Sequence, residues 1–156
     1  DLVRSRGLGD VYKRQRLPAA RRCAALTAAR GAAAGEERTP RMARYSSLLV
    51  WQKARLLVQQ VSTATRSARG EGDLLSQIRR ASISVAANIA EGAERGSDRE
   101  FSKHLRIADG SNAETQALAI IAGDAGIISP DQVDGIIETT ADLGKMINGL
   151  RKRCGD

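Results

Sequence analysis

The sequence predicts an all-α protein, an antiparallel up-and-down four-helix bundle. From Met42 onward, apolar residues recur at three- and four-residue spacings, which is the period of a helix with one buried face. No segment shows a convincing strand alternation, and two Gly-rich stretches interrupt the helical pattern. Helices of about 20 residues are about 30 Å long, and the short loops between them make antiparallel neighbours the economical arrangement.

The first two predicted helices span about residues 47–68 and 73–91. The inward stripe of the first consists of Leu48, Trp51, Leu57 (or Val58) and Val61. The inward stripe of the second consists of Leu75, Ile78, Ser82, Val85 and Ile89. Glycines follow both segments, and glycine after a periodic apolar run is typical of a helix end.

The third and fourth predicted helices each begin at a capping box. Ser97 precedes Glu100 by three positions, so the serine oxygen can accept a hydrogen bond from an exposed amide while Glu100 reaches back to the serine amide. Ser129 and Gln132 repeat this pattern. Pro130 occupies the first helical position, where its missing amide costs nothing.

Small residues are abundant in the second and third helices, so these two are predicted to form the tight pair of the bundle. The third helix continues to about Ala125, where Gly126 closes it, and the fourth carries an apolar stripe from Val133 to Leu150. Gly110 lies inside the third helix, where glycine costs about 1 kcal/mol relative to alanine. Close contact with the neighbouring helix would compensate this cost, and backbone approach by a ligand is the alternative.

A second stripe of the second helix keeps the helical spacing with mostly polar residues. If it faces the third helix, six polar side chains converge: Gln77, Arg80, Asn88, Glu91, Ser111 and Glu114. We interpret them as a buried hydrogen-bond network, within a subunit or between subunits, in which Arg80 neutralises Glu91 or Glu114. Breaking such a buried pair would cost about 3 to 5 kcal/mol. A small polar-ligand site or an enzyme site using Arg80, Asn88, Glu91 and Glu114 is the alternative.

The net charge of +7 is concentrated before residue 46. Residues 1–45 contain 11 Lys and Arg against 4 Asp and Glu, whereas residues 46–156 contain 14 of each sign. A basic stripe that could contact phosphates is formed by Arg79, Arg95, Arg99, Lys103 and Arg106. Acidic residues interleave with this stripe and no aromatic residue is placed to stack a base, so a mixed solvated face is the favoured interpretation.

The sequence gives little support to catalytic chemistry. A di-metal carboxylate site in a helical bundle needs a Glu-x-x-His motif on each of two helices, but the chain has a single histidine, His104. No phosphate-binding glycine loop occurs, and no serine has a base beside it, so we expect no metal, no cofactor and no enzymatic activity. Two distant cysteines favour a reducing cytoplasm, and no apolar run approaches the about 20 residues of a membrane span.

Residues 1–41 are expected to be a disordered leader that precedes a helical domain at 42–156. Asp10 to Gln15, DVYKRQ, resembles the translation of a transposon-end adaptor used in sequencing libraries, and residues 16–45 contain 10 Ala and 7 Arg without an apolar face. We therefore interpret the leader as adaptor and upstream DNA read in frame, with the true start at Met42. A mitochondrial targeting peptide or a basic nucleic-acid arm are the alternatives.

From Leu49 onward the chain resembles a known family. The resemblance lies in five segments: Val50-Trp51-Gln52-Lys53-Ala54, Gln77-Ile78-Arg79-Arg80-Ala81, Asn88-Ile89-Ala90-Glu91-Gly92, Phe101 with Leu105, and Ile107 to Ser111 with Glu114. These residues resemble the bacterial four-helix bundle proteins of the 23S rRNA-intervening sequence family. The resemblance covers nearly all of residues 45–153.

The resemblance implies an up-and-down bundle that assembles as a ring-like homopentamer. It also implies an oligomeric binding scaffold whose role in the cell is unsettled. A related branch resembles the accessory variability proteins of retroelements, which would partner a reverse transcriptase and RNA or DNA on a basic surface. The neutral charge of residues 46–156 departs from that branch, so a protein partner is the other expectation.

Overall fold

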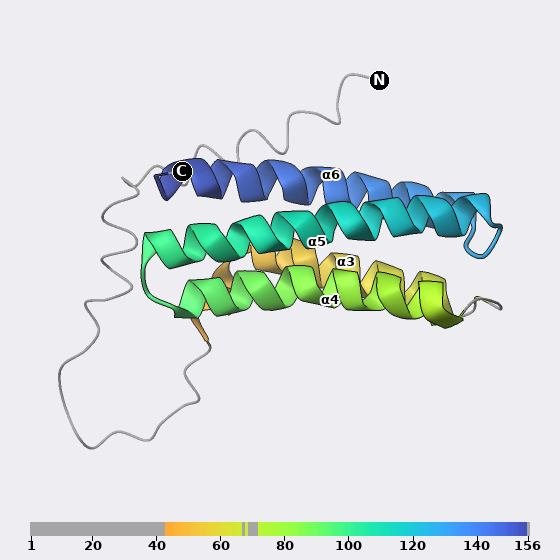
Figure 1. Ribbon diagram of the computed structural model, residues 1–156, viewed down its shortest axis with the longest axis horizontal. Coiled ribbons are helices and arrows are strands. Elements are labelled where there is room, and N and C mark those ends of the chain that lie inside the picture. Colours follow the sequence, from red (N-terminus) through yellow and green to blue (C-terminus); the bar gives the residue numbers. More distant parts are fainter. Residues whose placement is uncertain (1–42, 67, 69–71, 156) are drawn as a thin grey trace, which may run out of the picture. The chain divides into compact units, whose positions relative to one another are not determined.

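The computed structural model describes residues 43–66, 68 and 72–155, so the predicted leader at 1–41 lies outside the described residues. The elements are a short 3-10 helix and four α-helices (Figure 1). Their bounds are η1 Arg44–Ser47, α3 Leu49–Arg66, α4 Gly72–Glu94, α5 Asp98–Asp124 and α6 Pro130–Arg153. The predicted all-α chain of four helices is confirmed, and no strand occurs in the described segments.

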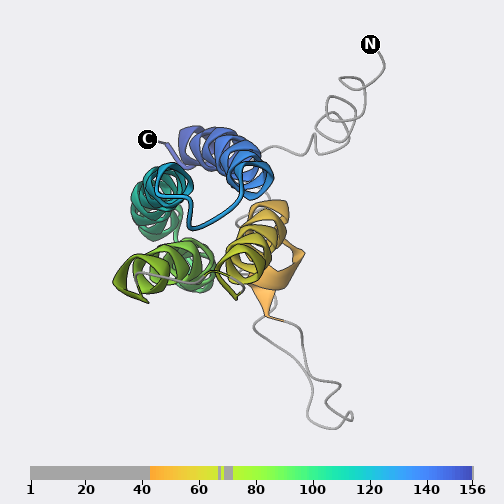
Figure 2. The ribbon, with the colours of Figure 1, turned by 90° about the vertical axis from the view of Figure 1, so that its right-hand side faces the viewer.

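The four helices surround one core, each at a corner when the bundle is viewed end-on (Figure 2). Helices that follow each other along the chain are neighbours, and α6 returns to pack against α3. The contacts between α4 and α5 run in opposite directions along the two helices. Ser84 bonds to Ser111, and eight residues further along α4, Gly92 meets His104, which precedes Ser111 by seven residues.

Local signals explain where the helices begin and end. The Ser97 hydroxyl accepts a hydrogen bond from the Glu100 amide at 3.2 Å, as predicted for the start of α5. The Glu100 carboxylate accepts from the Lys103 ammonium instead of from the Ser97 amide. At the start of α6, the Ser129 amide donates to Gln132 Oε1 at 3.2 Å. Gly126 follows α5 with a φ of +68°, a left-handed conformation that favours glycine.

The predicted inward stripes form the core. Leu57 and Val61 of α3, Ile78, Val85 and Ile89 of α4, Leu105 of α5 and Leu143 and Ile147 of α6 are all buried there. Ser82 is buried as its place on the stripe predicts, and its hydroxyl donates to the Arg79 carbonyl. The spacing of apolar residues therefore determined the buried face of each helix.

A few polar side chains also enter the core. Asn112 of α5 is buried, and its amide nitrogen donates to the Thr140 carbonyl of α6 at 2.9 Å. Thr115 is buried as well and donates to the Ser111 carbonyl one turn before it. Each of these two side chains donates a hydrogen bond, across to α6 or within α5, which makes it compatible with a buried position.

Candidate interaction surface on α4 and α5

Helices α4 and α5 approach each other closely at Gly92. A Cβ atom placed on Gly92 would lie 2.6 Å from the Cβ of His104 and 3.0 Å from the Cδ2 of Phe101. A side chain at this position would require α5 to shift, because the His104 Cβ is bonded directly to the backbone of α5. The prediction that Gly110 makes the close contact is wrong: Gly110 is exposed, and a Cβ on it would meet no atom within 4 Å.

A chain of hydrogen bonds joins α4 to α5 beside this contact. The hydroxyls of Ser84 and Ser111 lie 2.8 Å apart. Asn88 donates to the Ser84 carbonyl at 2.8 Å and to its hydroxyl at 3.1 Å, and its Oδ1 lies 3.4 Å from Nδ1 of His104. All four side chains are half-buried, and none of them makes an ion pair among the described residues, so hydrogen bonds hold the two helices together at this seam.

The structure brings together two of the six predicted polar residues and leaves the other four outside the seam. Asn88 and Ser111 belong to the hydrogen-bond chain, together with Ser84 and His104. Gln77, Arg80, Glu91 and Glu114 are exposed. The spacing pattern alone does not identify Ser84 and His104 as members of the site, although Ser84 occupies the same stripe of α4 as Asn88.

The expected pairing of Arg80 with Glu91 does not occur. The two residues lie on one helix, 11 positions apart, which separates them by about 16 Å along its axis. Glu91 instead bonds to Arg95, one turn further along the chain. Among the described residues, no ion pair links Arg80 to Glu114 either. Within one copy, the described residues therefore do not form the predicted charge network, because Arg80 and Glu91 share a helix face but lie at different levels. A network between subunits stays a prediction.

The face outside the seam carries exposed apolar residues. Ile107 and Ile121 are 53% and 52% exposed, and both lie on the stripe of α5 that contains Ser111 and Glu114. The two isoleucines are 14 positions apart, about 21 Å along the axis of α5, so this stripe exposes apolar side chains at two levels. We call the residues of the two stripes flanking the seam the α4–α5 outer face: Arg80, Glu91, Ile107, Glu114 and Ile121, with Lys103.

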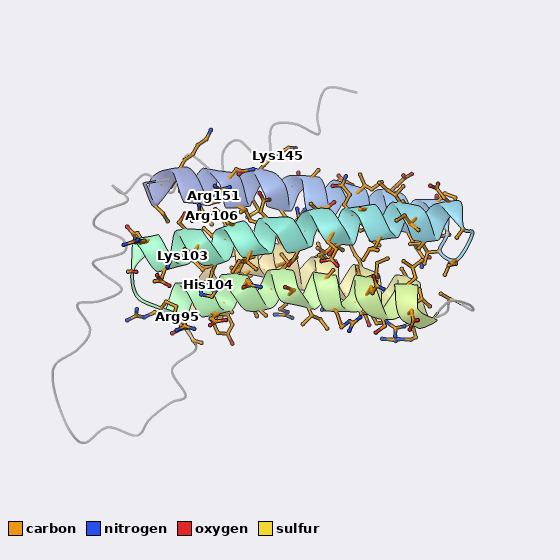
Figure 3. The ribbon with its side chains drawn as sticks, viewed as in Figure 1. Arg95, Lys103, His104, Arg106, Lys145 and Arg151 are labelled. Carbon is orange, nitrogen blue, oxygen red and sulfur yellow. The ribbon has the colours of Figure 1, made fainter. Side chains whose placement is uncertain are left out.

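The five predicted basic residues serve different purposes. Arg79 binds the end of α3, because its Nε and Nη2 donate to the hydroxyl and carbonyl of Thr65, each at 2.7 Å. Lys103 lies 2.8 Å from Glu100, and Arg95 bonds to Glu91. Arg99 and Arg106 are exposed on α5. Figure 3 shows Arg95, Lys103 and Arg106 toward the same end of the bundle as Arg151.

Two carboxylates on or beside this surface, those of Glu91 and Glu100, are held in their charged form. The hydrogen bond from Arg95 lowers the pKa of Glu91, and that from Lys103 lowers the pKa of Glu100. A general acid at neutral pH needs a raised pKa, so neither shift is in the direction that proton donation requires. These side chains are suited to ion pairing rather than to proton transfer.

The described residues do not meet the requirements of a metal site or of a membrane-spanning helix. No group of three or more His, Cys, Asp or Glu side chains in this part of the chain could hold a metal ion. No helix among the described residues is long and apolar enough to cross a membrane.

These features define an all-α bundle protein with a candidate interaction surface. The sequence profile of the 23S rRNA-intervening sequence protein family matches residues 46–149, and the chain belongs to this family. A crystal structure from Bacteroides thetaiotaomicron, described as a protein of unknown function from the S23 ribosomal protein family, matches the fold with a TM-score of 0.63. The two chains are 21% identical, and the match covers 67% of this chain and 99% of the other. The comparison with curated proteins gives no match.

Proposed function

We propose that this protein is a non-enzymatic cytoplasmic scaffold that assembles from copies of itself through the α4–α5 outer face and presents the remaining surface to a partner. The observation that carries the proposal is the exposure of Ile107 and Ile121 on one stripe of α5. Burying such residues against another chain would remove apolar area from water, which stabilises an assembly by about 25 cal/mol per Å². The family resemblance supports a ring of five copies.

The surroundings of the two isoleucines also suit an interface. Interfaces between proteins combine an apolar centre with a charged rim. On this face Ile107 lies between Lys103 and Glu114 along α5, and Arg80 and Glu91 lie across the seam on α4. Gly110 and Ala87 are exposed beside them, so helices of another copy could approach closely.

The mass of the protein in solution tests this proposal. We expect sedimentation velocity to give a mass of several chains for the wild type and of one chain for Ile107→Lys. The matched control is Ile120→Lys, because Ile120 is also exposed on α5 but lies off the Ser111 stripe. A wild-type protein of one-chain mass at all concentrations would contradict the proposal, and so would an Ile107→Lys variant that assembles as the wild type does.

A nucleic-acid accessory role is the second candidate, because basic residues gather at one end of the bundle. The last turn of α6 carries Arg151, Lys152 and Arg153, and the first turns of α5 carry Arg99 and Lys103. In a ring of parallel copies, these groups would all lie on one side of the ring. The local concentration of positive charge would then exceed what the net charge of the chain indicates.

A salt titration tests this second candidate. Fluorescence anisotropy with labelled RNA and DNA should show binding whose logarithm falls steeply with the logarithm of salt concentration. The variant Lys152→Glu with Arg153→Glu should weaken binding to both and reduce the slope. Measuring the chain from Met42 onward beside the full chain separates this end from the basic residues before residue 46. No binding by the shorter chain at low salt would remove nucleic acid as a ligand of the bundle and leave a protein partner.

A further inference from the structure

Four exposed charges on the α4–α5 outer face form two rows. The contact between Ser84 and Ser111 fixes which residues of the two helices lie at the same level. Arg80 precedes Ser84 by four residues and Glu114 follows Ser111 by three, so these two lie at one level, within about 1.5 Å. Each row therefore joins a residue of α4 to a residue of α5.

The second row has the opposite order of charges. Glu91 follows Ser84 by seven residues, and Lys103 precedes Ser111 by eight, so they also share a level. The first row is positive on α4 and negative on α5, whereas the second is negative on α4 and positive on α5. The rows lie about 16 Å apart, and Ile107 lies between them.

We propose that α4 of one copy packs antiparallel along α5 of the next copy, so that Arg80 faces Glu114 of the second copy and Glu91 faces its Lys103. This inference rests on the proposed self-assembly and names its pairing residues. Rotation about an axis parallel to the helices leaves the level of every residue unchanged. In two copies related by such a rotation, Arg80 of one copy therefore lies at the level of Glu114 of the other. Glu91 lies at the level of Lys103 in the same way, so opposite charges face each other in both rows.

The arrangement accommodates any ring size, because the levels are preserved whether two or five copies surround the axis. Because these charged side chains are exposed, they are available for ion pairs with another chain. Arg80 and Glu114 make no ion pair with each other among the described residues, and Glu91 and Lys103 are each about half exposed despite their local partners. All four side chains can therefore reach outward to a second copy.

Charge reversal tests the pairing. One variant reverses the charges of α4, with Arg80→Glu and Glu91→Lys, and another reverses those of α5, with Lys103→Glu and Glu114→Lys. Both keep the net charge unchanged. Each should weaken self-association about 100-fold, because like charges then face each other in both rows. The variant with all four changes restores opposite charges in both rows and should assemble as the wild type does.

The matched control reverses two charges on α6, with Glu138→Lys and Lys145→Glu, which are exposed away from the seam. It should leave the mass unchanged. Circular dichroism and a thermal melt of every variant separate loss of assembly from loss of fold. Reversed variants that assemble like the wild type would overturn the pairing while leaving self-assembly intact, and so would a folded four-change variant of one-chain mass. A wild type of one-chain mass would instead overturn the proposed function itself.

Discussion

The α3–α6 contact and the α4–α5 contact join helices by different means. Between α3 and α6, Lys53 Nζ lies 3.0 Å from Asp142 Oδ2, with side chains 28% and 26% exposed. Between α4 and α5, the contact is made by a glycine and by an uncharged hydrogen bond between the hydroxyls of Ser84 and Ser111. Helices α3 and α6 pair their charged side chains with each other, whereas α4 and α5 leave Arg80 and Glu114 exposed.

The α3–α6 ion pair stabilises the bundle itself, whereas the charges beside the α4–α5 contact stay available to another molecule. Small residues at the α4–α5 seam let the helix axes approach, which moves the longer charged side chains to the outside of the pair. At the α3–α6 contact, the longer side chain of Lys53 extends between the helices and forms an ion pair with Asp142. The α4–α5 contact is therefore expected to be sensitive to added volume, and the α3–α6 contact to changes of charge.

The largest effect is expected from adding volume at Gly92. Gly92→Val places branched carbon atoms where even a single Cβ would lie 2.6 Å from the Cβ of His104. The helices must separate, and we expect the free energy of unfolding to fall by about 3 kcal/mol. Urea denaturation followed by circular dichroism measures this change.

Gly110→Ala is the control for this prediction, since it adds one carbon to a glycine of the partner helix. Its Cβ would meet open space, so the higher helix propensity of alanine should raise the free energy of unfolding by about 1 kcal/mol. Equal effects at the two glycines would show that the close approach of α4 and α5 does not limit the volume at this seam.

A smaller effect is expected at Arg79, which connects α4 to the end of α3. Arg79→Ala removes two hydrogen bonds from a charged group to Thr65, and the free energy of unfolding should fall by about 1.5 kcal/mol. Arg80→Ala, at the next position, should change it by only about 0.3 kcal/mol, because Arg80 is exposed. A loss of several kcal/mol at Arg80 would instead support the buried pair predicted from the sequence.

The sequence predicted what depends on periodicity and missed what depends on the level of one helix against another. The stripes through Val61 and Ile89 are buried, and Ser97 caps α5, because these features arise within one helix. The approach at Gly92 depends on how far α5 slides along α4, and no local pattern encodes that distance. The ion pair of Lys53 with Asp142 joins residues 89 positions apart, which a single sequence cannot relate.

Among the contacts between helices, the smallest loss of stability is expected at the α3–α6 ion pair, and this loss depends on pH. The hydrogen bond from Lys53 lowers the pKa of Asp142 below its ordinary value of about 3.9. The folded state therefore binds the proton less readily than the unfolded chain, so this contribution is present above pH about 3.9 and is lost as the pH falls through the lower folded pKa.

Asp142→Asn should reduce the free energy of unfolding by about 1 kcal/mol at neutral pH, and the difference from the wild type should shrink near pH 3. Urea denaturation at both pH values measures it, with Glu138→Gln as the exposed control on the same helix. A difference that is equal at the two pH values would mean that Asp142 stabilises the contact by its shape rather than by its charge.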